Sequence, residues 1–247
     1  MAEEISIEKV CVLAGKVMLS SGAETYRVED TMNRIAFAYG IENPQSYATP
    51  TGISFSRDIA ATSHFLRTIY RTTNLNKIEK VNSISRQITT EHIDLKVAYF
   101  LLQRVDQDQL IYPGWLQITI AALASGCFNI MFDGTWVDFL PAFIIGGVGF
   151  STMILIDYLV EIRFIAEFTA SLVIGFLAVL FVSIGIGMQL DKIIISAVMP
   201  LVPGLHITNA IRDLLAGHLV SGLSKGVEAI ITAFAIGAGV AVVFGII

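Results

Sequence analysis

Long apolar runs fill residues 113–247, and their lengths predict membrane-spanning helices. A helix needs about 20 mostly apolar residues to cross the hydrocarbon core of a bilayer. Four runs approach or exceed that length: Trp115–Phe132, Val137–Val160, Phe168–Met188 and Ala229–Ile247. A fifth run, Ile193–Val202, has only ten residues and leads into a segment with Pro200 and Pro203. We therefore expect about five transmembrane segments, one of them short and broken by proline.

In residues 1–112, apolar positions recur with the spacing of amphipathic helices, and shorter stretches alternate as strands do. Helical spacing runs through Ile7–Met18, Val28–Tyr39, Leu75–Ile88 and Leu95–Leu102. Alternation predicts short strands at Ser46–Thr49, Ile53–Arg57 and Phe65–Arg71, with a turn at Pro50–Gly52. This pattern predicts an α+β domain in which helices flank a small antiparallel sheet.

The segment Ser21-Gly-Ala-Glu24 has the form of a capping box at the start of the second helix. In that motif the serine side chain accepts a hydrogen bond from the N3 amide, and the glutamate reaches back to the cap. Five charged or aromatic residues then crowd the same helix start: Glu24, Tyr26, Arg27, Glu29 and Asp30. They form either a binding or gating surface or an ordinary solvated face.

Charge separates the two parts of the chain. Although 54% of the 247 residues are hydrophobic, residues 1–112 hold 12 of the 16 Lys and Arg and 13 of the 21 Asp and Glu. We therefore expect a cytosolic domain at 1–112 and a transmembrane helical domain at 113–247. The net charge of −5 and the lack of a basic cluster argue against nucleic-acid binding. Cys11 and Cys127 form no disulfide framework or metal-ligand spacing, and we expect both in the core.

The distribution of Lys and Arg near the helix ends predicts the orientation in the plasma (inner) membrane. Basic residues continue up to Lys96 and Arg104, which predicts a cytoplasmic N-terminus. The loop Asp133–Trp136 has no Lys or Arg and should face outside, while Lys192 is a weak exception to the rule. Five crossings then leave the C-terminus outside. The charged, amphipathic first thirty residues do not resemble a cleavable signal peptide.

The segment Pro200–Lys225 carries the most unusual polar pattern in the apolar part of the chain. His206, Asn209 and Asp213 are spaced to share one helical face, with Thr208 and Arg212 beside it. A helix that begins near Thr208, after the prolines, would place its partly positive N-terminus close to membrane depth. Broken helices use such ends to hold carboxylates and ions. The alternative is a surface amphipathic helix whose Arg212 and Asp213 lie in water.

Other candidate chemistry is sparse. Asp157 and Glu161 lie four residues apart at the end of the second apolar run. One could be a proton or cation site, but we favour an interfacial helix end that meets Arg163. Asn129 could line a path or make an interhelical hydrogen bond. No phosphate-binding loop, dinucleotide fingerprint or histidine cluster occurs, so we expect no cofactor, no metal and no catalytic residues.

Three motifs in order resemble the threonine/serine exporter family, over nearly the whole chain. They are SGAETYRVEDTMNRI at Ser21–Ile35, TPTGI at Thr49–Ile53 and PGLHITNAIRDLLAGHLVSGLSK at Pro203–Lys225. The resemblance implies a cytosolic N-terminal domain and efflux of threonine and serine driven by an ion gradient. Longer members carry a second membrane domain, which implies that this chain is the larger subunit of a split form. The split form is associated with dicarboxylate (succinate) export, so both substrate classes stay open.

The family signature adds weight to residues of the third motif, Ser221 among them. We expect Thr208, Asn209 and Arg212 to bind the substrate, with Arg212 either on its carboxylate or in an ion pair within the protein. We expect Asp213, and as a second candidate Asp157, to couple transport to the ion gradient. The broken-helix backbone would be formed by Pro200, Pro203, Gly204, Gly217 and Gly222.

The expected partners are a separate small membrane subunit, a small-molecule substrate and the lipid bilayer, with a homo-oligomer left open. Two other function classes compete with the exporter. One is a membrane enzyme with a hydrolytic cytosolic domain, which the lack of a recognisable nucleophile and base weakens. The other is a regulatory membrane subunit without its own transport activity.

Overall fold

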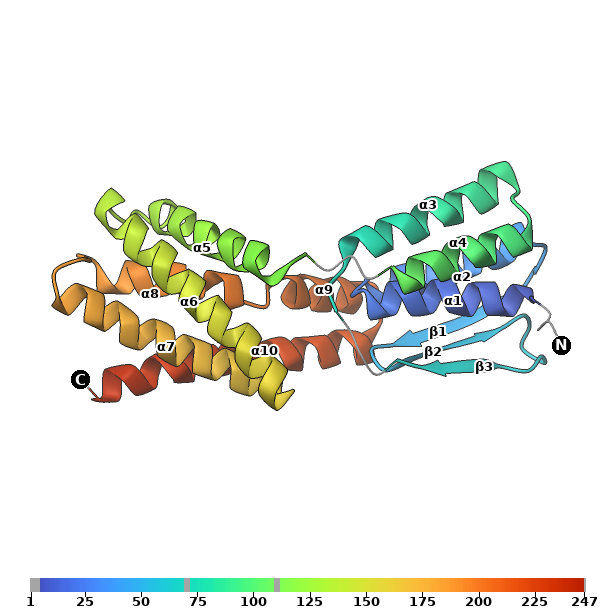
Figure 1. Ribbon diagram of the computed structural model, residues 1–247. Helices are drawn as coiled ribbons and strands as arrows, with labels where there is room; N and C mark the ends of the chain where they lie inside the picture. Colours follow the sequence, from blue (N-terminus) through green and yellow to red (C-terminus); the bar gives the residue numbers. More distant parts are fainter. Residues whose placement is uncertain (1–4, 69–71, 109–111, 247) are drawn as a thin grey trace. The chain divides into compact units, whose positions relative to one another are not determined.

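A computed structural model of the chain describes residues 5–68, 72–108 and 112–246 (Figure 1). The chain forms two compact units. The first contains residues 1–110 and 205–226, and the second contains residues 111–204 and 227–247. Residues 205–226 thus belong with the charged N-terminal part, although the 94 residues 111–204 separate them from it. The assignment of residues 1–112 to the cytosol and of 113–247 to the membrane stays a prediction.

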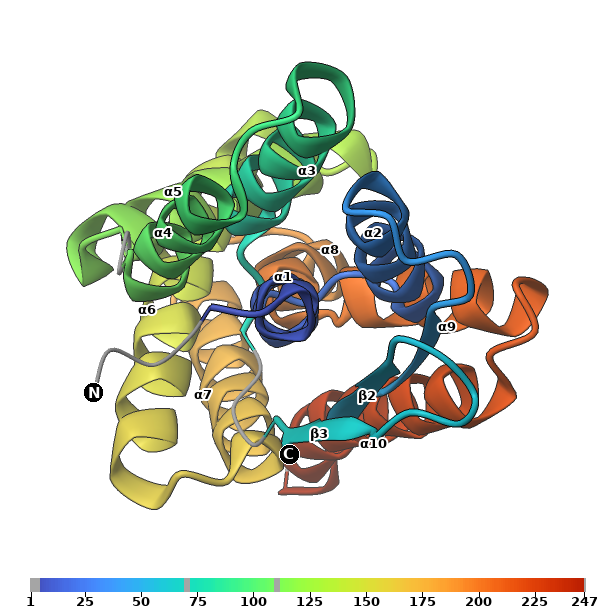
Figure 2. The ribbon, with the colours of Figure 1, turned by 90° about the vertical axis from the view of Figure 1, so that its right-hand side faces the viewer.

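The first unit has a three-stranded antiparallel sheet covered by helices. Its elements are α1 (Ile7–Ser20), α2 (Thr25–Ala38), β1 (Gln45–Thr49), β2 (Gly52–Ser56), β3 (His64–Arg67), α3 (Leu75–Glu91), α4 (Leu95–Gln107), α9 (Gly204–Leu215) and the start of α10 (Leu219–Ile246). The strands are in the order β1-β2-β3, and α1 and α2 pack on the sheet. A further pair, α3 and α4, packs on α1 and α2 (Figure 2).

The expected helices and small antiparallel sheet of this unit are confirmed. The turn predicted at Pro50–Gly52 joins β1 to β2, where Thr49 pairs with Gly52. The expected third strand ends at Arg67, and residues 69–71 of that expectation lie outside the described residues. Apolar residues at the expected helical spacing, such as Val10 and Leu102, are completely buried in one core with Phe55 of the sheet.

The capping box predicted at Ser21–Glu24 is wrong. Helix α2 begins at Thr25, so Glu24 occupies the N-cap position, and its side chain makes no capping hydrogen bond. Ser21 instead ends α1, where its amide bonds back to the carbonyls of Val17 and Met18. The two residues of the apparent motif therefore belong to different helix ends: Ser21 ends α1, and Glu24 precedes α2. The side chain that caps α2 comes from a distant part of the sequence.

The second unit is a helical bundle. Its elements are α5 (Gly114–Met131), α6 (Trp136–Val160), α7 (Arg163–Ser183), α8 (Leu190–Val198), the 3₁₀ turn η1 (Met199–Leu201) and the rest of α10. Helices α5, α6, α7 and α10 are long and apolar enough to cross a membrane. Helices α8–η1 and α9 pass the same test only when taken together across the break at Val202 and Pro203. Four of the about five expected segments are thus confirmed as candidate spans, and the short fifth one is a candidate only together with α9.

Several boundaries differ from the expectation. Helix α7 covers Arg163–Ser183 rather than Phe168–Met188, because the chain turns at Gly185, whose φ of 76° favours glycine. Helix α9 begins at Gly204, not near Thr208. Helix α10 begins ten residues before the expected Ala229. Cys11 is buried as expected, but Cys127 is exposed on α5.

Small residues allow close helix contacts in the bundle. Ile145, Ile174 and Ile193 form its core with alanines and with Ile236 of α10. At Gly239, a side chain would collide with the hydroxyl of Ser171 and with the backbone of α7 at Phe168 and Leu172. At Gly237, two residues earlier in α10, a methyl group would meet no atom within 4 Å.

We expect the substitution Gly239→Ala to destabilise the protein by roughly 1–3 kcal/mol, because a helix backbone cannot move locally to accept the methyl group. Gly237→Ala is the matched control and should leave stability nearly unchanged or slightly raised. The thermal unfolding midpoint of the purified protein in detergent measures both. Equal midpoints for the two variants would contradict the close contact of α10 with α7.

Candidate functional site

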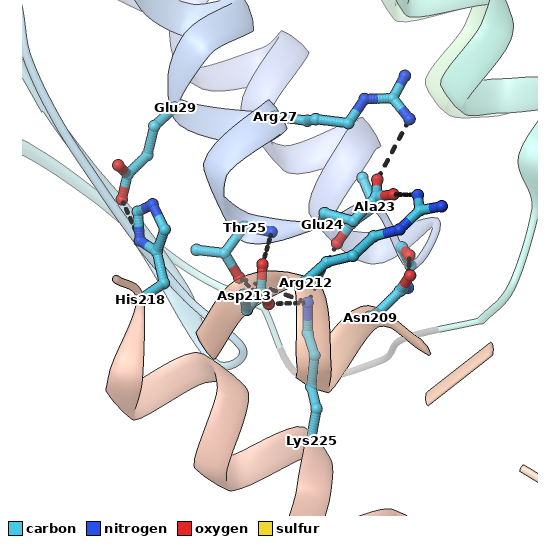
Figure 3. A network of polar contacts seen from close by, with 11 residues as sticks. Ala23, Glu24, Thr25, Arg27, Glu29, Asn209, Arg212, Asp213, His218 and Lys225 are labelled. Atoms are coloured by element: carbon cyan, nitrogen blue, oxygen red, sulfur yellow. Dashed lines mark hydrogen bonds and ion pairs between the residues drawn. The ribbon is translucent and has the colours of Figure 1, made fainter. Parts of the chain in front are cut away.

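The polar face of α9 lies against the start of α2, and both belong to the first unit (Figure 3). The carboxylate of Asp213 is completely buried there. Its Oδ1 accepts a hydrogen bond from the amide of Thr25 at 2.9 Å, and its Oδ2 accepts one from the Thr25 hydroxyl at 2.9 Å. Lys225 of α10 places its Nζ 2.7 Å from the same Oδ2.

Asp213 therefore does the work of an N-cap for α2. The first amides of a helix have no intrahelical partner, and they carry the positive end of the helix dipole. Glu24 leaves these amides without a side-chain acceptor, and Asp213 supplies one from 188 residues away. A buried carboxylate is stable only when it is paired and hydrogen-bonded, and here both conditions are met.

Lys225 is buried beside Asp213 and is part of the same arrangement. Its ammonium group also donates to the carbonyl of Ala23 at 3.3 Å and contacts the Thr25 hydroxyl at 3.4 Å. We refer to Glu24, Thr25, Arg212, Asp213 and Lys225 as the α2–α9 network. Lys225 could not be predicted as a partner of Asp213 from the sequence, because twelve residues and a helix end separate the two.

Glu24 links two arginines at the edge of this network. Its Oε1 lies 2.6 Å from Nη1 of Arg212, and its Oε2 lies 3.2 Å from Nη1 of Arg27. Burial alone would raise the pKa of the Glu24 carboxyl, but a backbone hydrogen bond and the two arginines outweigh it and lower the pKa below its ordinary value. Glu24 is therefore ionised at neutral pH. The Arg212 side chain is 56% exposed, so its guanidinium also meets solvent.

The other expected substrate residues have different surroundings. Asn209 is half-buried and donates its amide to the carbonyl of Gly22 at 2.9 Å. Thr208 lies on the exposed side of α9. The structure thus brings Asn209, Arg212 and Asp213 together against the start of α2, and Thr208 lies outside that contact.

A second contact between titratable side chains follows the end of α9. Nδ1 of His218 lies 3.8 Å from the carboxylate of Glu29, which also accepts a hydrogen bond from the amide of Ala48 at 2.8 Å. Burial raises the pKa of Glu29 above its ordinary value, and the charge of Asp213 adds to the rise. Ala48 and His218 act in the opposite direction without cancelling it. Glu29 is thus easier to protonate than a carboxylate in water.

The residues expected to form the broken-helix backbone have distinct positions. Pro200 lies in η1, Pro203 is buried in the break, and Gly204 is the first residue of α9. Gly217 ends α9 with a φ of 86°, and the following amide bonds back to the carbonyl of Asp213. At Gly222 a side chain would collide with Leu214, so glycine allows α10 to return closely along α9.

The carboxylates at the end of α6 are not part of this site. Asp157 is exposed on α6, and its side chain makes no hydrogen bond or ion pair within the described parts of the chain. Glu161 is exposed, with a left-handed backbone at the helix end. Arg163 pairs with Glu167 at 2.8 Å rather than with either of them.

The second unit contains a buried polar group that the sequence analysis missed. Asp138 is completely buried and accepts hydrogen bonds from the Thr135 hydroxyl at 2.7 Å and from the amide of Met188 at 2.6 Å. Threonine three residues before an acid at the start of an apolar run is a capping signal that could have identified it. Asn129 is also buried and donates to the carbonyl of Thr135, but its Oδ1 has no hydrogen-bond partner in the described structure.

No group of three or more potential metal ligands occurs within residues 5–68, 72–108 and 112–246. The chemistry available at the α2–α9 network is therefore that of carboxylates, an ammonium and guanidinium groups. Such groups can replace an ion-pair partner within the protein by a charged ligand, and the carboxylates can bind a proton. We find there no hydroxyl or thiol beside a histidine base that would indicate covalent catalysis.

The chain is similar to known proteins over most of its length. A family model described as "Putative threonine/serine exporter" matches residues 9–247. The "Probable succinate transporter subunit YjjP" of Escherichia coli K12 is 25% identical over 237 residues, which cover 90% of this chain and 88% of that protein. The protein of the same name from Klebsiella aerogenes is 23% identical, covering 91% of this chain and 87% of the relative.

A "Threonine/serine exporter" of Corynebacterium glutamicum is 23% identical over 239 residues. The match covers 92% of this chain but 48% of that exporter, so this chain spans about half the length of the relative. No solved structure matches the chain.

The buried pair of Asp213 and Lys225 generates a stability prediction. Asp213→Asn keeps an oxygen for the Thr25 amide but removes the charge that Lys225 faces, and we expect a loss of about 3–5 kcal/mol. Lys225→Gln should cost a similar amount, and the double variant should lose clearly less than the sum of both. Denaturant titration of the purified protein in detergent gives the free energies of unfolding.

Glu42→Gln, at an exposed carboxylate of the same unit, is the control and should change stability little. Additive losses within about 0.5 kcal/mol in the double variant would show that Asp213 and Lys225 do not interact.

Proposed function

The chain belongs to the threonine/serine exporter family, and from that premise we propose that it is a subunit of a secondary exporter. It would move small carboxylate-bearing metabolites, such as threonine and serine, out across the plasma membrane with the energy of an ion gradient. The observation that carries this proposal is the family match over residues 9–247, which includes every member of the α2–α9 network. Four to five helices suited to membrane crossing support it.

We propose that Arg212 is the group that recognises the substrate carboxylate. A guanidinium is suited to bidentate binding of a carboxylate, and this one is more than half exposed. In the described state its partner is the carboxylate of Glu24, which has the same chemistry as the substrate. The substrate would then replace Glu24 on Arg212, with Asn209 and Thr208 of the same helix supplying further polar contacts.

For ion coupling, we propose the Asp213 carboxylate, with Asp157 as the second candidate. Protonation of Asp213 would remove the charge that holds Lys225 and leave fewer acceptors for Thr25. A proton could in this way loosen the contact of α9 with α2. Asp157 is a simpler candidate, because its exposed side chain has no described partner to lose.

One observation favours a dicarboxylate such as succinate as the alternative substrate. The relatives named as succinate transporter subunits match along 87% and 88% of their length, against 48% for the relative named as a threonine/serine exporter. The word "subunit" in those names also supports a partner, which we propose is a separate small membrane protein. A homo-oligomer and a regulatory subunit without its own transport activity are the remaining alternatives.

An efflux assay tests the proposal. Cells that lack their own exporters are loaded with labelled threonine, serine or succinate, and they express this chain alone or together with a small membrane protein encoded beside it. We expect efflux of one substrate class that requires the partner and falls at least tenfold in Arg212→Gln, because the substrate carboxylate loses its guanidinium. Arg104→Gln, at an exposed arginine of α4, is the control and should transport normally.

Membrane levels and unfolding midpoints of both variants must match those of the unsubstituted chain. Undiminished efflux in Arg212→Gln would contradict the proposed substrate contact. No efflux of any of the three substrates from cells that contain both correctly inserted chains would favour the regulatory alternative.

The exchange of Glu24 for substrate makes a second prediction. Glu24→Gln removes the charge that competes for Arg212, so we expect the KM for the exported carboxylate to fall several-fold. The change is limited to that range because the ion pair is partly exposed and screened by solvent. Concentration-dependent efflux measures the KM, with Glu42→Gln as the control. An unchanged or raised KM, with normal expression, would argue against competition between Glu24 and the substrate.

A further inference from the structure

A polar cavity of about 220 Å³ lies between α2 and α3 in the first unit. Helix α2 contributes four lining residues and α3 contributes three. They are Arg27, Asp30, Thr31 and Arg34 from α2, and Asn82, Ser85 and Arg86 from α3. Three guanidinium groups and one carboxylate give this set a net charge of +2. The cavity is separate from the contact between α2 and α9, although Arg27 borders both.

The three arginines differ in how strongly they are already engaged. Arg34 pairs with Asp30 at 2.8 Å, and both side chains are more than half exposed. Arg27 pairs with Glu24 at 3.2 Å. The exposed guanidinium of Arg86 makes no hydrogen bond or ion pair with the described residues. At least one guanidinium is thus available to a ligand, and a second is held only by an exposed pair.

Ser85 supplies an independent sign of a ligand. Its side chain is 2% exposed, and its hydroxyl oxygen has no hydrogen-bond partner in the described structure. Buried polar groups in proteins are nearly always hydrogen-bonded, so an unpaired hydroxyl in the wall of a cavity indicates a missing partner. A hydroxyl can donate to an anionic oxygen, and the neighbouring guanidinium groups offer paired donors for the same oxygens.

We propose that this cavity binds a small anion that carries a carboxylate or phosphate group, held by Arg86, Arg34 and Ser85. The volume of about 220 Å³ suits a ligand between inorganic phosphate and a four-carbon dicarboxylate. The site is distinct from the proposed substrate contact at Arg212.

The anion would also influence transport, a step that rests on the proposed function. Glu24 is shared between Arg27 at the cavity and Arg212 on α9. An anion that draws Arg27 into the cavity leaves Glu24 to Arg212 alone and strengthens that pair. Occupation of the cavity would therefore hold Arg212 away from substrate and slow efflux.

Isothermal titration of the purified full chain with inorganic phosphate and with succinate tests the binding site by itself. We expect one site that persists in Arg212→Gln and is weakened at least tenfold in Arg86→Gln and several-fold in Ser85→Ala. Binding should also weaken as the salt concentration rises. The matched control is Arg104→Gln, an exposed helical arginine outside the cavity, which should bind normally. The two ligands distinguish a phosphate site from a carboxylate site.

Arg212→Gln separates this inference from the proposed function. Binding that survives Arg212→Gln and is lost in Arg86→Gln supports the cavity site even if the efflux assay fails. Succinate binding that is lost in Arg212→Gln but retained in Arg86→Gln would overturn the cavity site, as would the absence of any binding of either anion. Unfolding midpoints establish that each variant is folded.

Discussion

The burial of one carboxylate, Asp213, organises the contact between the two chain segments of the first unit, residues 1–110 and 205–226. A charge without solvent contact must find counter-charge and donors inside the protein, and Asp213 finds Lys225 and the start of α2. Since α2 has no capping side chain of its own, each partner satisfies a need of the other. The fold therefore depends on residues about 190 positions apart, and neither the helix start nor the carboxylate would be satisfied without the other.

Helix α10 carries Lys225, the ion-pair partner of Asp213, and its residues belong to both units. Lys225 lies in its first two turns, which belong to the first unit, while Ile236 lies in the core of the second. On the proposed mechanism, the Asp213 ion pair is a suitable point for a proton to act on the start of α10.

Periodicity in the sequence was enough to predict the helices of both units, the small sheet and the number of candidate spans. It also placed Asn209 and Asp213 on one face of α9, because i, i+4 spacing is a local property. The partners of that face could not be predicted in this way. Thr25, Glu24 and Lys225 meet α9 through tertiary packing, and the apparent capping box at Ser21–Glu24 concealed the need of α2 for a distant acceptor. Asp138 was missed although its capping signal with Thr135 is local, because that signal lies at the start of an apolar run.

Two carboxylates, Glu24 within the α2–α9 network and Glu29 beside it, respond to different variables. The pKa of Glu24 is lowered, so near neutral pH Glu24 stays ionised, and only a competing anion can change its distribution between Arg27 and Arg212. The pKa of Glu29 is raised by burial and by Asp213, so Glu29 takes up a proton at a higher pH than Glu24 does. Protonation of Glu29 removes a negative charge near Asp213, which makes the remaining charge on Asp213 less costly. Anion concentration and pH would thus act on the same network through separate residues, with Glu24 the point at which a ligand acts and Glu29 the point at which acidity acts.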